Sequence, residues 1–313
     1  MNLEFNKNSE IVFVLIISTI LALFGIYYFQ FIIFLYPVLF VVLGVRRGLK
    51  YSLMDLAASA AIIGLMVDIL SGMLIFAAFM PLTFTMINMI KRRKNSTIIL
   101  IISTIVFLLS ISLIINFVNM NGINIIGQLK GNIAQIINSQ MDIFSQLNLS
   151  DEEFQAVKDL HGSYLQSVLA VVPSIVMIFS LVVSYLNYLL STIALRRLGY
   201  PAIYIPKFLN FKLPRNIFLG LTIMFFTTFL LNYFNLINFF EVILNLIVLT
   251  FFIFFIQGIS VVDYILDKKN IRSAFRIFIL WLIIDLMPIF GIFILILGLL
   301  DVIFDFRKIG KSY

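Results

Sequence analysis

Long apolar runs separated by short clusters of Lys and Arg make up most of the chain. The run from Ile11 to Val45 exceeds the roughly 20 residues that one membrane helix needs, so it predicts two spans. The polar positions Tyr27, Tyr28 and Gln30 mark the turn between them. The run from Tyr51 to Ile90 predicts a second pair of spans for the same reason.

The second pair divides at Ser71-Gly72, where the apolar run is interrupted. A fifth span is expected from about Thr97 to Phe117, and a sixth from Tyr164 to Leu195. Residues 1–199 therefore predict a six-span membrane domain.

Residues 200–216 form a segment rich in proline, aromatic and basic residues. Pro201, Pro206 and Pro214 exclude a continuous helix, because proline lacks an amide donor. Aromatic residues alternate with cations, which favours a position along the cytoplasmic interface, with the rings among lipid headgroups. The segment is a natural linker between the six-span domain and a C-terminal membrane extension over residues 217–313.

The C-terminal extension contains two ordinary apolar runs and a third from Ile277 to Phe304, which Pro288 and Gly291 interrupt near its middle. A single span there would place the final cations opposite the other basic clusters. A hairpin of two short helices or a re-entrant segment is therefore favoured. We expect an all-α, polytopic integral membrane protein with about 8–10 membrane segments.

Basic residues set the expected orientation. They cluster at residues 46–50, 91–94, 196–197 and 268–276, and cationic loops are retained on the cytoplasmic side. Both termini are then cytoplasmic, and the polar loop 119–163, where acids outnumber lysines, is extracellular. The heavy use of Ile, Phe, Asn and Lys is typical of AT-rich bacterial genomes, so we expect a bacterial cell membrane.

The extracellular loop has a pattern of its own. Apolar residues recur at helical spacing from Ile126 to Phe144, which predicts an amphipathic helix. Ser150 followed by Glu153 is a capping-box pattern that would open a second short helix. The two helices either lie on the outer leaflet or cover an outward-facing pocket as a lid.

Composition argues against several function classes. The chain is 62% hydrophobic and 12% charged, whereas a soluble domain carries roughly 25% charged residues. Its net charge of +7 resides mainly between the spans, which argues against nucleic-acid binding. Cysteine is absent and His161 is the one histidine, so a metal centre is disfavoured. Phosphate-loop and nucleophile-elbow motifs are absent, so we expect no enzyme, no cofactor and no ATPase in this chain.

Polar and aromatic residues gather at the expected outer ends of the spans. A small molecule held beneath the loop would contact them, but the aromatic belts of membrane interfaces produce the same pattern. Asp68 is either a pocket acid or a surface acid that reaches water. The candidate ligand-facing residues are Tyr28, Gln30, Asp68, Asn116, Tyr164 and Gln166.

Small residues form stripes on two spans. Such stripes let helices approach closely, either within the protein or at a docking face for another membrane subunit. The stripes comprise Ser18, Ala22 and Gly25 on the first span, and Ala57, Ala61 and Gly64 on the third.

Acidic residues inside apolar runs are costly and suggest function. Asp285 lies beside the proline break, a typical construction of ion or proton sites, although a charge pair that fixes the hairpin explains it equally well. Asp55 and Asp263 lie near inner boundaries, where we expect them to pair with Lys50 and Lys268.

Four short motifs are spread along the whole chain. They are Arg46-Arg47-Gly48-Leu49-Lys50, Phe79-Met80-Pro81-Leu82, the segment from Pro206 to Arg215 that ends Lys212-Leu213-Pro214-Arg215, and Gly298-Leu299-Leu300-Asp301 with Phe304-Asp305-Phe306-Arg307-Lys308. These motifs resemble those of the bacterial membrane family with domain of unknown function 2232 (DUF2232, YybS-like). That family is distantly similar to the substrate-binding (S) components of energy-coupling-factor vitamin transporters, and to the rod-shape-determining MreD proteins.

The resemblance to S components implies a substrate held from the outer side, and an A-x-x-x-A docking motif on the first helix. Here the first helix has only Ser18-x-x-x-Ala22, and the full motif, Ala57 to Ala61, lies on the third span. The C-terminal extension has no counterpart in a six-span S component.

Three functions compete on this basis. The first is a ligand-capturing, S-component-like transport subunit that relies on a membrane coupling subunit and ATPases. The second is a non-transporting membrane scaffold comparable to MreD. The third is an ion-coupled carrier that works through Asp285.

Overall fold

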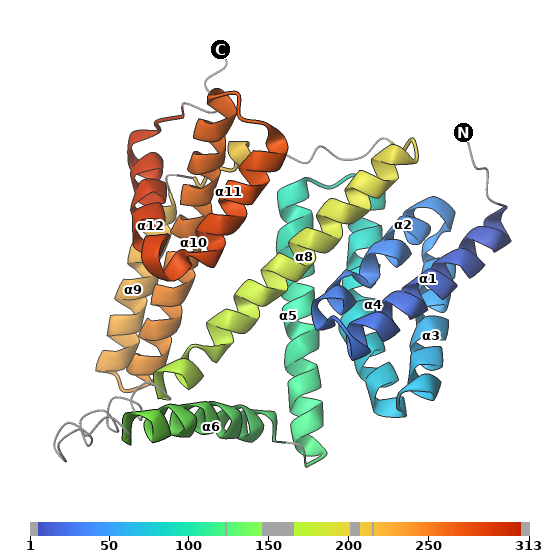
Figure 1. Cartoon of the computed structure of the whole chain (residues 1–313), viewed down its shortest axis with the longest axis horizontal. Coiled ribbons are helices and arrows are strands. Elements are labelled where there is room, and N and C mark those ends of the chain that lie inside the picture. The colour runs from blue at the N-terminus through green and yellow to red at the C-terminus, as the bar shows by residue number, and fades with distance from the viewer. Residues whose placement is uncertain (1–5, 123, 146–165, 201–206, 215, 308–313) are drawn as a thin grey trace. The chain divides into compact units, whose positions relative to one another are not determined.

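The computed structural model describes residues 6–122, 124–145, 166–200, 207–214 and 216–307 (Figure 1). Within these ranges all regular secondary structure is helical, and eight helices are long and apolar enough to cross a membrane. Large apolar side chains such as Leu65 and Leu113 are exposed along them, so the bilayer must cover these surfaces. The prediction of an all-α, polytopic membrane protein is confirmed.

The chain divides into two compact units. The first unit is Met1–Asn132 with Val176–Ile205, and the second unit is Ile133–Ile175 with Pro206–Tyr313. In chain order, the helices that precede residue 217 are α1 (Lys7–Tyr27), η1 (Gln30–Leu35), α2 (Pro37–Arg47), α3 (Leu49–Met66), α4 (Ile69–Lys91), α5 (Ser96–Met120), α6 (Ile125–Ser145), α8 (Val172–Arg197) and η2 (Phe208–Asn210).

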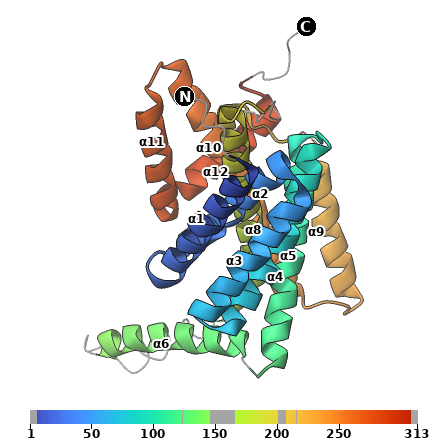
Figure 2. The same cartoon turned by 90° about the vertical axis from the view of Figure 1, so that its right-hand side faces the viewer.

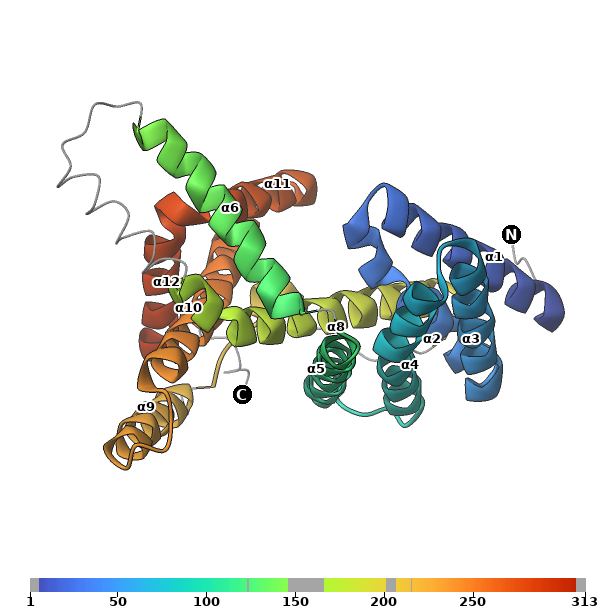
Figure 3. The same ribbon diagram turned by 90° about the horizontal axis from the view of Figure 1, so that it is seen from below.

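The first unit is built in two layers. Helices α3, α4 and α5 lie in a row, and α1 and α2 pack behind them (Figures 2 and 3). The core between them is aromatic: Phe79 and Phe107 stack with ring centroids 5.9 Å apart, and Phe34 meets Phe179 of α8 edge-on at 4.7 Å. The α2–α3 link, the α4–α5 link and the last turn of α8 share one end (Figure 1), which we call the cation-bearing end.

Local sequence fixes where these helices begin and end. Pro37 opens α2, where its missing amide costs nothing, and Gly48 separates α2 from α3 with a φ of +119°. The turn between α3 and α4 lies at Val67 and Asp68, so the expectation of a break at Ser71-Gly72 was wrong. A Cβ atom on Gly72 would lie 2.6 Å from the Ala60 carbonyl oxygen, so this glycine serves close helix packing instead.

The predicted amphipathic helix of the polar loop is confirmed, because α6 runs from Ile125 to Ser145. The expected second helix at Ser150 to Glu153 lies outside the described residues.

The second unit is centred on a close helix pair. Its helices are α9 (Ile217–Tyr233), α10 (Phe239–Lys268), α11 (Ser273–Asp285) and α12 (Met287–Phe304). Gly258 and Gly298 bring the backbones of α10 and α12 together, while α9 and α11 flank α10. The run from Ile277 to Phe304 is two helices that meet at Leu286, because Pro288 lies in the first turn of α12 and cannot continue a preceding helix.

Candidate functional site

Hydroxyl groups of α1 and α3 form a buried cluster in the first unit. The hydroxyls of Thr19 and Ser59 are hydrogen-bonded at 2.9 Å, and Ser18 Oγ lies 3.5 Å from Ser59 Oγ. Ser18 and Ala22 are fully buried, so the small-residue stripe of α1 packs within the unit. The packing interpretation of this stripe is the one that the burial of Ser18 and Ala22 supports.

Asp55 of α3 lies one turn from Ser59 and is only 4% exposed. In the described part of the chain its Oδ2 atom has no hydrogen-bond partner, and the hydroxyl of Tyr36 lies within electrostatic range. Lys50 is exposed and forms no ion pair with Asp55. The expected pair was therefore wrong, because the two side chains leave α3 in different directions.

A second set of buried polar groups lies beside the aromatic core. Thr83 and Ser103 are four residues from Phe79 and Phe107, on α4 and α5. Because these helices are antiparallel and four residues make about one turn, both hydroxyls lie one turn nearer the cation-bearing end than the stacked rings. Both side chains are fully buried, and neither hydroxyl has a partner among the described residues.

Helix α8 adds polar groups to the same interior. Asn187 donates one hydrogen bond to the Phe34 carbonyl at 2.7 Å and one to the Val183 carbonyl at 2.8 Å. Its side-chain oxygen and the hydroxyl of Ser184 are buried without a partner in the described chain. We call Thr83, Ser103, Ser184 and Asn187 the polar layer.

Charged groups occupy the cation-bearing end of the first unit. Glu10 of α1 is 6% exposed and accepts from both Arg46 and Arg47 at the end of α2. The Arg46 guanidinium also lies over the ring of Tyr200, 5.9 Å from its centroid. The Arg46-Arg47 motif thus ties α1 and the end of α8 to α2.

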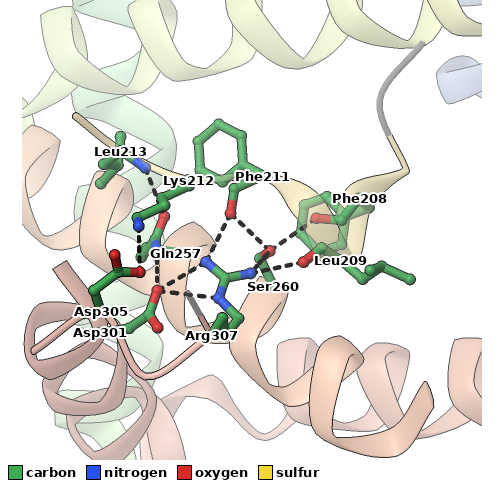
Figure 4. A network of polar contacts seen from close by, with 10 residues as sticks. All are labelled: Phe208, Leu209, Phe211, Lys212, Leu213, Gln257, Ser260, Asp301, Asp305 and Arg307. Carbon is green, nitrogen blue, oxygen red and sulfur yellow. Dashed lines mark hydrogen bonds and ion pairs between the residues drawn. The ribbon is translucent and has the colours of Figure 1, made fainter. Parts of the chain in front are cut away.

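The second unit contains a clamp centred on Arg307 (Figure 4). The guanidinium donates to Asp301 Oδ2 at 2.8 and 3.1 Å, with both side chains almost fully buried. It also donates to the carbonyls of Leu209 at 2.7 Å and Phe211 at 2.8 Å. Arg307 therefore holds the described part of the proline-rich segment, residues 207–214, onto the end of α12.

Helix α10 completes the clamp. Gln257 donates to Asp301 Oδ2 at 2.6 Å and accepts from the Leu213 amide at 3.1 Å, while Lys212 pairs with Asp305. Two of the sequence motifs, one ending in Arg215 and one in Lys308, thus meet in a single network. Neither Gln257 nor Asp301 was predicted from the sequence to have a role of its own, although each is a polar residue within an apolar run and therefore carried a signal.

The candidate ligand-facing residues are mostly exposed. In the first unit, Tyr28 stacks on Phe24, Gln30 begins η1, and Asn116 donates back to the Ser112 carbonyl. Gln166 is exposed in the second unit, and Tyr164 lies outside the described residues. The described contacts of these residues are local and do not assemble a pocket.

Asp68 is the N-cap of α4. Its carboxylate accepts hydrogen bonds from the Ser71 hydroxyl at 2.5 Å and the Ser71 amide at 2.8 Å. These two bonds hold the pKa of Asp68 below its usual value, and the bond from the Ser71 hydroxyl has the larger effect. The side chain is nevertheless fully exposed. The cap explains why an acid lies at this helix end.

Two acids of the second unit differ from expectation. Asp263 pairs with Arg276 of α11 at 2.6 Å rather than with Lys268, because the α10–α11 turn brings the arginine back. Asp285 is exposed at the end of α11, and it makes no ion pair with any residue that the structure describes. The charge pair suggested for the hairpin is not formed there.

The small-residue stripe of α3 is partly open. Ala61 is exposed, while Ala57 and Gly64 are half-buried, and the buried face of α3 instead carries Ser59 and Ala60. No three His, Asp or Glu side chains in the described ranges gather closely enough to hold a metal ion.

Comparison with known proteins agrees with the motifs. The profile of the family described as predicted membrane protein (DUF2232) matches residues 11–302, which is nearly the whole chain. No curated protein and no solved structure matches the chain. The chain belongs to the DUF2232 family of predicted membrane proteins.

Proposed function

We propose that this integral membrane protein is an S-component-like, substrate-binding subunit of a small-molecule transport system in a bacterial cell membrane. It has no ATPase of its own and draws energy from a coupling subunit with ATPases. The observation that carries the proposal is the polar interior of the first unit. Asp55 and the polar layer contribute side-chain oxygens that are buried there and have no hydrogen-bond partner in the described chain.

An unpaired polar atom in an apolar interior costs roughly 1–3 kcal/mol. Seven of the nine side-chain atoms of this kind in the described residues lie in the first unit. A protein that only fixes its neighbours gains nothing from such groups. A protein that takes up a polar molecule uses them as hydrogen-bond partners, which supports a binding role.

The open stripe of α3 supports a partner. Ala61 and the half-buried Ala57 form the A-x-x-x-A motif, and their small side chains permit close approach of another membrane helix. The covered stripe of α1 leaves α3 as the docking helix of this chain. Loop 119–163 begins at the end of α5 that lies away from the basic clusters, and we propose that it faces the cell exterior.

A membrane scaffold comparable to MreD is the second candidate. The clamp favours it, because Arg307 is saturated with partners and fixes residues 207–214 as a rigid surface. Such a surface suits a protein that positions others without moving.

Affinity purification from native membranes in mild detergent, followed by mass spectrometry, tests the proposal. We expect stoichiometric recovery of a transmembrane coupling protein with ATPases, and loss of both from the Ala61→Leu variant. Ala274→Leu is the matched control, since Ala274 is an exposed alanine on α11. Recovery of envelope-assembly proteins without an ATPase would support the scaffold and reject the transport role.

A further inference from the structure

Asp55 is a buried carboxyl with no role in the packing described above. Its residue is 4% exposed, and its Oδ2 atom is enclosed without a hydrogen-bond partner in the described chain. It lies six residues after Leu49, the first residue of α3. At about 1.5 Å per residue, it is about 9 Å from the cation-bearing end, inside a membrane-spanning helix.

None of the charged side chains described on α3, or on the helices packed against it, neutralises a negative charge on Asp55. Helix α1 contributes Glu10, whose carboxylate is taken by the two arginines at the end of α2. On α3 the nearest cation in sequence, Lys50, is exposed, and Lys91, at the cation-bearing end of α4, is exposed as well. Tyr36, just before α2, is the titratable side chain that faces Asp55.

We propose that Asp55 is a proton-binding site of the first unit, protonated at rest and exchanging its proton through the cation-bearing end. A buried carboxylate without a cation beside it is strongly unfavourable, and one bound proton removes its charge. A metal ion is a poor alternative occupant, because no second Asp, Glu or His joins Asp55 in a cluster within the described residues. The proposal requires no coupling subunit, so it can be tested on the purified chain alone, whatever partners that chain has.

Labelling of the full-length protein with dicyclohexylcarbodiimide tests this proposal, since the reagent modifies protonated carboxyls in apolar surroundings. Trypsin cleavage after Lys50 and Lys91 releases a peptide whose acids are Asp55 and Asp68. Asp68 is fully exposed and thus an internal control for an ionised carboxyl. At neutral pH we expect at least tenfold more label on Asp55 than on Asp68, and no label at that position in Asp55→Asn.

Infrared difference spectroscopy provides a second measurement that needs no reagent access. Wild type at neutral pH should show a protonated-carboxyl band that Asp55→Asn lacks and that high pH removes. If the wild-type and variant spectra are the same and Asp55 is labelled no more than Asp68, Asp55 is ionised and the proposal is overturned. Suppression of the label by sodium, but not by choline at equal ionic strength, would also overturn it in favour of a metal cation site.

Discussion

Gly258 of α10 faces the backbone of α12 at Ile294 so closely that a Cβ atom on Gly258 would lie 1.9 Å from the Ile294 carbonyl oxygen. The relationship is reciprocal one turn further on, where a Cβ atom on Gly298 would lie 2.0 Å from the Phe254 carbonyl oxygen. Neither carbonyl belongs to a flexible side chain, so the helices themselves would have to separate.

We therefore expect Gly258→Ala and Gly298→Ala each to lower the free energy of unfolding by about 1–3 kcal/mol, because overpacking forces the backbones apart. Thermal unfolding in detergent, followed by size-exclusion chromatography, measures this. Gly220→Ala on α9 is the control, since nothing lies within 4 Å of its added methyl group. It should be neutral or stabilising by up to about 1 kcal/mol. Equal melting temperatures for all three variants would contradict the close packing.

Arg307→Met should destabilise the second unit by about 3–5 kcal/mol, because Asp301 would be left as a buried carboxylate without its cation. Arg307→Lys should recover little, since an ammonium cannot reach the two carbonyls and the carboxylate together. Limited proteolysis near residues 207–214 reports release of the segment.

The double variant Asp301→Asn with Arg307→Met should lose less stability than the two single variants combined, because it removes both charges together. Lys269→Ala, at an exposed cation on the same unit, is the control and should behave as wild type. Strict additivity of the two single effects would show that the pair does not act as a unit.

Asp68 should make stability depend on acid pH. Its folded pKa is below the ordinary value, so the unfolded state binds the proton more readily. The stabilisation is therefore complete above the unfolded pKa of about 4 and is lost as pH falls through the folded pKa. Asp68→Asn should weaken the pH dependence of the first unit's melting temperature below about pH 4. Glu241→Gln, at an exposed acid, should leave that pH dependence unchanged.

Single-cysteine labelling tests the proposed orientation. Because the sequence contains no cysteine, an introduced cysteine is the one thiol that can react. Asn121→Cys and Asn132→Cys, at exposed positions near α6, should react with a membrane-impermeant maleimide on intact cells. Arg92→Cys, between α4 and α5, should react only after permeabilisation. The reverse pattern would mean that the basic clusters face outward.

The membrane class and the spans follow from apolar length and charge alone, because both act on the chain before any tertiary contact forms. The first turn at Tyr27 to Gln30 and the helix from Ile125 to Ser145 were predictable for that reason. The α3–α4 turn was misplaced because Gly72 breaks the hydropathy pattern while serving a helix contact.

Apolar length and the placement of cations are enough to establish that this chain crosses a membrane repeatedly and which of its loops are basic, and short motifs mark its family. The roles of the polar residues follow only from how the helices pack. Pairing of Arg307 with Asp301 and Asp263 with Arg276, and isolation of Asp55, depend on which helix faces packed together. Sequence spacing defines the face of one helix, but the partner of that face is set by close packing between helices, which no single run records.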